Sequence, residues 1–257
     1  MGLLHFFLGV EVIPTQAGLF LSNKYIQELL SNTNMSGAKD VSTPLSTTQS
    51  LKLLDGTTNV DNTEFRRING SLLLWYLKQT IFHGIQLTKS GPPALITYSD
   101  VDWAGNIDDR TSTSAYISFL GPNPISWISK KQRVVARSTT KVEYRALENV
   151  ASETMWLLRL LHELGFPLKA TPLLLCDNLG ATHLSFNPVQ HSRIKHIQID
   201  LHFVLRHVHT QDQLTDLLTK PLSRQRTKML RYKIGLADGC SILQGCIKTD
   251  CKDQGND

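Results

Sequence analysis

Four acidic residues stand at positions where a metal-binding carboxylate could be built: Asp100, Glu143, Asp177 and Asp216. Asp100 and Asp177 follow the apolar runs 94–98 and 172–176, which have the character of buried strands. Buried carboxylates are costly unless they are paired or bind a metal, and hard cations such as magnesium prefer several oxygen ligands. Two such ions can hold the attacking and leaving oxygens of a phosphodiester, so these residue types indicate metal-assisted phosphodiester chemistry.

Each of these acids also has an ordinary structural explanation. Glu143 could close a capping box that starts at Thr140, and Asp177 could cap the helix that follows it. Asp100 could belong to a turn at a strand end, and Asp216 could lie on the solvated face of a short helix. Taken alone, each residue favours the ordinary explanation. Their joint occurrence at matching ends of successive elements favours a shared site.

The segment 94–220 has an order of elements that could bring the acids together. Its patterns predict strands over residues 95–100, 113–120 and 125–129, a helix over roughly 140–164, and a strand over 173–176. The last strand is continuously apolar, as expected for a parallel strand that is covered on both faces. Ligand sites in such sheets gather at the carboxyl ends of the strands, which is where Asp177 lies.

The flanking segments are simpler. Residues 5–22 are predicted to form a β-hairpin and residues 25–30 a short helix. Residues 31–61 have the composition of a linker, and a helix is predicted from about residue 62 to 83. Residues 236–257 combine Gly, Asp and Lys with scattered Cys, and we expect a disordered tail there.

Composition sets broad limits on function. The 257 residues suffice for one large domain or two modest ones, and the net charge of +5 favours a polyanionic partner. No apolar stretch has the length of a membrane span, so we expect no membrane partner and an intracellular location. The four cysteines match no zinc motif, and a reduced protein is expected. Five histidines lie between residues 191 and 209, and we expect them on a helical surface and not in a zinc site. They are His191, His196, His202, His207 and His209.

Longer blocks of sequence resemble a known family. In chain order these blocks are residues 98–105, 109–114, 125–127, 129–132, 138–147, 176–178, 187–188, 195–197 and 212–220. They are similar to the RNase H domain of copia-type LTR retrotransposon Pol polyproteins. Further blocks that resemble the tail of the preceding reverse transcriptase are residues 7–12, 24–26, 43–44 and 66–73. The Tyr-x-Asp-Asp signature of the family's polymerase is missing, so no polymerase activity is expected.

The resemblance implies an α/β fold. An RNase H-like mixed sheet flanked by helices is expected over residues 94–235, and a small α+β remnant of the reverse transcriptase with a linker over residues 1–90. It further implies that Asp100, Glu143, Asp177 and Asp216 are the catalytic carboxylates and hold two magnesium ions, for which manganese can substitute. The implied location is the cytoplasm, in a virus-like particle, or the nucleus.

The implied substrate is the RNA strand of an RNA–DNA hybrid, with other Pol domains as partners and no small-molecule cofactor. Helix shape and the 2′-hydroxyl would then govern discrimination. The candidates for contacts with the nucleic-acid strands are Ser112, Lys130, Lys131, Gln132, Arg133 and Asn178. An ordinary solvated turn is an equally good explanation of this basic cluster.

Two features depart from the family. Lys141 stands where relatives usually carry an acid, two residues before Glu143. Segments that relatives contain are missing near Leu74 and near Leu205, and apolar residues keep helical spacing through the second gap. We therefore predict one helix from about residue 192 to 209, with the family's fifth strand absent or vestigial and Asp216 displaced. The alternative to an active nuclease is thus a catalytically impaired fragment that keeps the fold as a nucleic-acid-binding or structural module.

Overall fold

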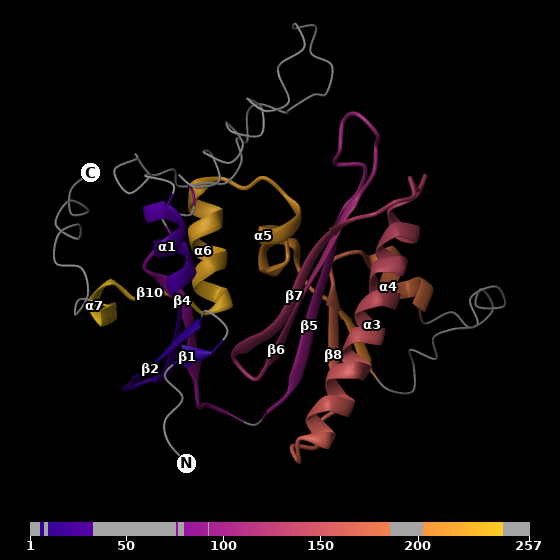
Figure 1. Cartoon of the computed structure of the whole chain (residues 1–257). Helices are drawn as coiled ribbons and strands as arrows, with labels where there is room; N and C mark the ends of the chain where they lie inside the picture. The colour runs from indigo at the N-terminus through magenta and orange to yellow at the C-terminus, as the bar shows by residue number, and fades with distance from the viewer. Residues whose placement is uncertain are drawn as a thin grey trace, which may run out of the picture. The chain divides into compact units, whose positions relative to one another are not determined.

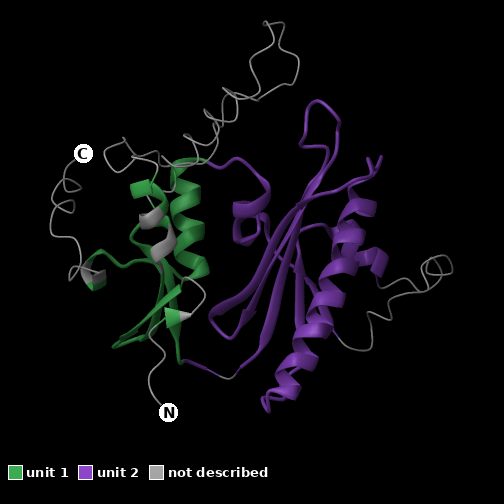
Figure 2. Ribbon diagram, in the orientation of Figure 1, with its two compact units in different colours: residues 1–47, 54–89, 223–257 green, residues 48–53, 90–222 purple. Residues whose placement is uncertain are grey.

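A computed structural model describes residues 6–7, 10–32, 76, 80–91, 93–185 and 203–243 of the chain. Two compact units are distinguished in Figure 2. Unit 1 comprises residues 1–47, 54–89 and 223–257, and unit 2 comprises residues 48–53 and 90–222. The chain thus leaves unit 1 after residue 89 and returns to it at residue 223.

Unit 1 is built on an antiparallel sheet with the order β1-β2-β3-β4-β10. Its strands are Phe6–Phe7, Val10–Thr15, Gly18–Asn23, His83–Thr88 and Leu236–Asp238, and its helices are α1 (Lys24–Asn32), α6 (Arg224–Ile234) and α7 (Cys240–Leu243). The expected hairpin and short helix at the start of the chain are therefore confirmed. The ring of Phe20 is fully buried, and a Cβ atom at Gly84 would lie 2.4 Å from it, so only glycine fits at this position in β4.

Unit 2 contains a five-stranded mixed sheet in the order β7-β6-β5-β8-β9 (Figure 1). The strands in chain order are β5 (Leu95–Asp102), β6 (Thr113–Leu120), β7 (Asn123–Lys131), β8 (Leu173–Cys176) and β9 (Val204–His207). The first three pair antiparallel, whereas β8 pairs parallel with both β5 and β9. The predicted parallel strand is thus confirmed, and the sheet has the mixed α/β architecture of the RNase H-like fold.

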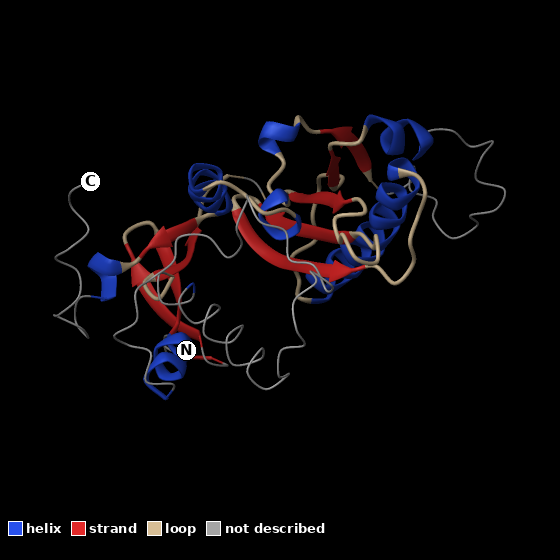
Figure 3. Cartoon of the chain, turned by 90° about the horizontal axis from the view of Figure 1, so that it is seen from above, coloured by secondary structure: helices blue, strands red, loops and turns tan. Residues whose placement is uncertain are grey.

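Helices cover both faces of this sheet. The long helix α3 (Thr139–Glu163) packs on β5, β6 and β8, where Thr154 Oγ1 lies 3.4 Å from Thr97 Oγ1. The short helix α5 (Asp216–Thr219) contacts β5, β6 and β7. It reaches Asp100, which is three residues from Thr97 and therefore on the opposite face of the strand. The layers can be followed in Figure 1 and, from above, in Figure 3.

The core of unit 2 lies between α3 and the sheet. Leu147 and Val150 of the helix pack against Leu174 of β8 and Leu205 of β9, and all four side chains are buried. Gly165 ends the helix with φ 79°, and the N–H groups of Gly165 and Phe166 bond back to His162 and Leu161. This is a glycine-dependent helix ending.

Three expectations need correction. Residues 204–207 form the paired strand β9 and not the end of a helix from 192 to 209, whose residues 192–202 lie outside the described ranges. Residues 236–243 form β10 and α7, so the tail that was expected to be disordered begins with ordered structure. Leu236–Asp238 are held there by antiparallel pairing with β4. Cys240 is disulfide-bonded and departs from the reduced state expected for the cysteines, whereas Cys176 is a free thiol.

Candidate metal centre

Strand register brings Asp100 and Asp177 to one edge of the sheet. The parallel pairing of β5 with β8 ends at the partners Ser99 and Cys176. Asp100 and Asp177 are the next residues along the two chains, so both lie just past the end of this pairing. Asp177 follows the last residue of β8, whereas Asp100 is still in β5, which stays paired with β6 up to Asp102. Asp177 is not needed to cap the following helix α4 (Leu179–Ser185), because the side chain of Asn178 accepts the N–H of Ala181 at 2.9 Å. The capping explanation of Asp177 is therefore wrong.

Glu143 reaches the same edge from helix α3. The helix begins after Ser138, so Glu143 is its fifth residue and lies too far along the first turn to close a capping box. It is 5% exposed and follows the buried residue Val142. Carboxylate oxygens of Asp100, Glu143 and Asp177 all lie within 4.8 Å of one another. We refer to these three residues as the carboxylate cluster.

Burial and crowding act strongly on the cluster. Burial, together with the negative charges of Asp100 and Asp177, raises the pKa of Glu143 to about 9. Burial also raises the pKa of Asp100, although Lys220 and Thr219 partly oppose the shift. The buried thiol of Cys176 lies 3.9 Å from Glu143 Oε2, and its pKa is raised by burial and by that carboxyl group. An all-oxygen set of this kind has the chemistry of a hard divalent cation site.

Asp216 is linked to Asp100 of the cluster through Lys220. It is the first residue of α5 and is 4% exposed, so it is not the solvated residue of the ordinary explanation. The Lys220 ammonium lies 2.7 Å from Asp216 Oδ1 and 3.0 Å from Asp100 Oδ1. Burial alone would lower the pKa of Lys220, but the two carboxylates raise it. Thr219 donates its hydroxyl to the other oxygen of Asp100.

Sequence reasoning missed Thr219 and Lys220 as parts of the site. The available signal was the spacing of four residues between Asp216 and Lys220, which places an acid and a base on one helical face.

A buried glutamine fixes the segment that carries these residues. The side chain of Gln213 is fully buried and donates to the carbonyl oxygen of Ser99 at 2.9 Å. Its own carbonyl accepts the hydroxyl of Thr215 at 2.6 Å. Because Ser99 directly precedes Asp100, these bonds tie the start of α5 to the strand that carries the cluster. Asp216 and Asp100 contact the same ammonium, but Asp216 is not one of the three residues of the carboxylate cluster, so its expected displacement stays a prediction.

The residues predicted to contact nucleic acid fall into two groups. Ser112 is 1% exposed and accepts the N–H of Ala104, and Asn178 caps α4, so both have structural roles. Lys130, Lys131 and Arg133 are exposed at the end of β7, with Gln132 partly buried beside them. Lys131 pairs with Asp109 at 2.5 Å. The basic group therefore remains a candidate contact surface, whereas Ser112 is not open to an approaching strand.

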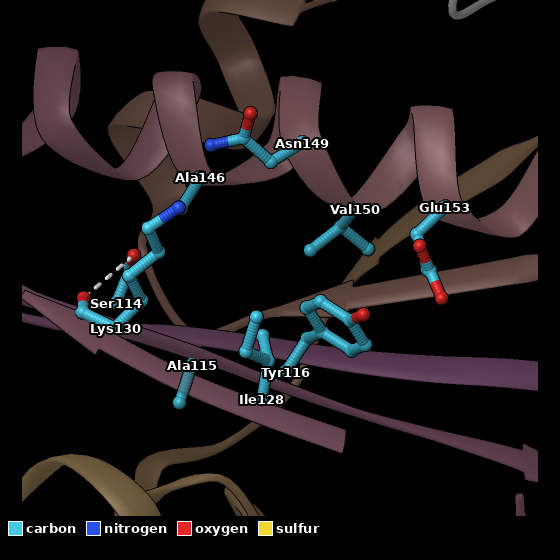
Figure 4. A pocket seen from close by; sticks show the side chains of 9 residues that line it. All are labelled: Ser114, Ala115, Tyr116, Ile128, Lys130, Ala146, Asn149, Val150 and Glu153. Atoms are coloured by element: carbon cyan, nitrogen blue, oxygen red, sulfur yellow. Dashed lines mark hydrogen bonds between the residues drawn. The ribbon is translucent and has the colours of Figure 1, made fainter. Parts of the chain in front are cut away.

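A separate pocket of about 240 Å³ lies between α3 and strands β6 and β7 (Figure 4). Its lining includes Tyr116, Asn149 and Glu153, and Ser126 donates to Glu153 at 3.3 Å. None of the four acids lines it. The candidate metal centre therefore lies outside this pocket.

The chain is similar in sequence to several known proteins. The chain is 45% identical, over 91% of its length, to a retrovirus-related Pol polyprotein from transposon RE1 of Arabidopsis thaliana. It is 30% identical, over 89% of its length, to a Pol polyprotein from transposon TNT 1-94 of Nicotiana tabacum. The chain belongs to the copia-type Pol polyprotein family. It is also 34% identical to the uncharacterized mitochondrial protein AtMg00810 of Arabidopsis thaliana, over 61% of this chain and 79% of that protein.

The copia-type relatives are much longer than this chain, which spans 19% of the RE1 polyprotein and 21% of the TNT 1-94 polyprotein. The alignment with RE1 covers 278 positions, more than the 257 residues of the chain, so part of that relative has no counterpart here. This agrees with the internal losses expected from the sequence. No protein-family model and no solved structure matches the chain. No helix among the described residues combines the length and apolar character needed to cross a membrane.

Proposed function

We propose that this copia-type Pol segment is an RNA–DNA hybrid ribonuclease that hydrolyses the RNA strand in a metal-dependent reaction. The observation that carries the proposal is the convergence of Asp100, Glu143 and Asp177 within 4.8 Å, with Asp216 joined to Asp100 through Lys220. These residues come from β5, from helices α3 and α5 and from the residue that follows β8, and these elements are distant in sequence. A solvated surface gives no reason for such acids to be buried together.

The residues present fit a divalent cation. Asp100, Glu143 and Asp177 supply oxygen ligands only, and burial with the charges of Asp100 and Asp177 raises the pKa of Glu143 to about 9, an effect that a divalent cation would oppose. Magnesium held there would supply a means of lowering the pKa of water and of stabilising the leaving 3′ oxygen. The chain's own part is to fix the carboxylates: β5 and β8 set two of them by register, and Gln213 holds the segment of Asp216.

The exposed basic group at the end of β7 is the proposed strand contact. Lys130 and Arg133 can neutralise phosphates without reading base sequence, which suits a substrate recognised by helix shape. Other domains of the Pol polyprotein are the proposed protein partners.

The proposal is tested by cleavage of a labelled RNA–DNA hybrid in magnesium, with wild type compared with Asp177→Asn. We expect the variant to lose about 100-fold or more of the rate, because a metal ligand loses its charge. Glu163→Gln is the matched control, since Glu163 is an exposed acid at the opposite end of α3 from Glu143. Binding of the hybrid without cleavage by wild type would contradict the nuclease and favour the alternative of a binding or structural module.

A further inference from the structure

The ammonium of Lys220 lies between two carboxylates of the candidate metal centre, those of Asp100 and Asp216. Lys220 follows the last residue of α5, and its side chain is 31% exposed, whereas those of Asp100 and Asp216 are 1% and 6% exposed. The ammonium therefore approaches from solvent and ends between two buried carboxylates. Its distances to them, 3.0 and 2.7 Å, are those of charge-assisted hydrogen bonds.

The contacts divide the centre into two halves. In one half, the oxygens of Asp100, Glu143 and Asp177 lie close together. In the other half, Asp100 and Asp216 are bridged by Lys220, and Thr219 donates to the second oxygen of Asp100. Asp100 is common to both halves. A divalent ion bound between Asp100 and Asp216 would meet the positive charge of Lys220 at the same oxygen atoms, and the two cations would repel each other.

We propose that Lys220 is a resident cation which competes with the second divalent ion for the Asp100–Asp216 half of the centre. The free protein then binds one divalent ion through the carboxylate cluster, and a second ion enters only when the ammonium leaves. This inference rests on the proposed function, because it requires the carboxylates to bind divalent cations.

The chemistry of lysine suits such a role. Its ammonium is a compact charge on a flexible four-carbon stem, so it can leave without any movement of the backbone. The partial exposure of Lys220 leaves a path to solvent. A phosphodiester near the centre would offer the released ammonium a new partner of the same charge as the carboxylates. Entry of the second ion is then favoured by the substrate.

The test counts manganese ions bound to the full chain at neutral pH without nucleic acid, by electron paramagnetic resonance of the free ion. We expect one ion per wild-type chain and two per Lys220→Met chain, or a second site at least about tenfold tighter than in wild type. Lys220→Arg keeps the charge and should bind one ion. Lys169→Met is the matched control: Lys169 is exposed and precedes β8, at the end of that strand opposite Asp177, so one ion is expected.

A second measurement does not depend on the methionine variant being folded. Lys220→Gln keeps a hydrogen-bond donor at this position but lacks the charge. Manganese should raise its thermal midpoint more than that of wild type, because two ions stabilise the folded state in place of one.

Two outcomes would overturn the inference about Lys220 while leaving the metal centre intact. One is two equivalent sites in wild type, and the other is a single site of unchanged affinity in Lys220→Met and Lys220→Gln. No manganese binding to any of these proteins would overturn the metal centre itself and this inference with it. Neither manganese binding nor the thermal midpoint depends on cleavage of the hybrid. A failure of the nuclease activity would therefore be seen separately, in the cleavage assay.

Discussion

Burial and neighbouring charge act strongly on Glu143. In the absence of metal, its pKa of about 9 in the folded protein lies well above the value of 4.5 for an unperturbed glutamate. Between these values the folded state holds a proton that the unfolded state has released. The free energy of unfolding should therefore fall as pH rises from about 4.5 to 9, by at most about 1.4 kcal/mol per pH unit from this group.

Denaturant unfolding in chelator at several pH values measures this slope. Glu143→Gln is the control, because glutamine has a similar shape and does not titrate. The variant should lose less stability than wild type as the pH rises. Equal slopes for the two proteins would show that Glu143 does not hold its proton in the folded state.

The four acids could be singled out from the sequence because each follows a recognisable pattern, and register then brings Asp100 and Asp177 together as expected. The role of Lys220 could not be foreseen in the same way. Its contact with Asp100 joins residues that are 120 positions apart, and the spacing to Asp216 alone does not reveal it. Gln213 was missed because a polar residue in a loop gives no sign of full burial.

At the scale of elements, β9 is where pattern and structure diverge. Helical spacing of apolar residues continues into Leu205 and Val208, yet residues 204–207 pair with β8. The strand has only four residues, which is too few for the spacing of apolar residues to distinguish a strand from a helix. Pairing with β8 therefore decides the conformation of this segment. The sheet gains its fifth strand because unpaired backbone groups of β8 offer hydrogen bonds along its length.

The strand can be tested with two neighbouring residues. In β9 the side chain of Leu205 is 5% exposed and packs in the core, whereas Val204 is 39% exposed. Leu205→Ala should lower the free energy of unfolding by about 2–5 kcal/mol, because it leaves a cavity in the core. Val204→Ala should cost less than about 1 kcal/mol. Chemical denaturation gives both values, and similar losses at the two positions would contradict the burial pattern of β9.

For the molecule as a whole, the order of the chain sets how its two units depend on one another. Unit 2 is made almost entirely from the continuous segment 90–222, whereas unit 1 needs the chain to return after it. Strand β10 pairs with β4, and α6 contacts β10, so the last part of the chain completes the sheet of unit 1. The buried Phe20 also depends on this part, because Gly239 lies against its ring.

Removal of residues 223–257 should therefore affect the two units unequally. Unit 1 loses β10 and α6, so the amide protons of β3 and β4 should exchange much faster with solvent. Unit 2 keeps its sheet, α3 and all four acids, so the amides of β5, β6 and β8 should remain protected. Hydrogen exchange read by mass spectrometry follows both sets of amides in one experiment. Loss of protection in β5 and β8 together with β3 and β4 would mean that the two units fold as one cooperative body, and that the metal centre needs the end of the chain although none of its carboxylates lies there.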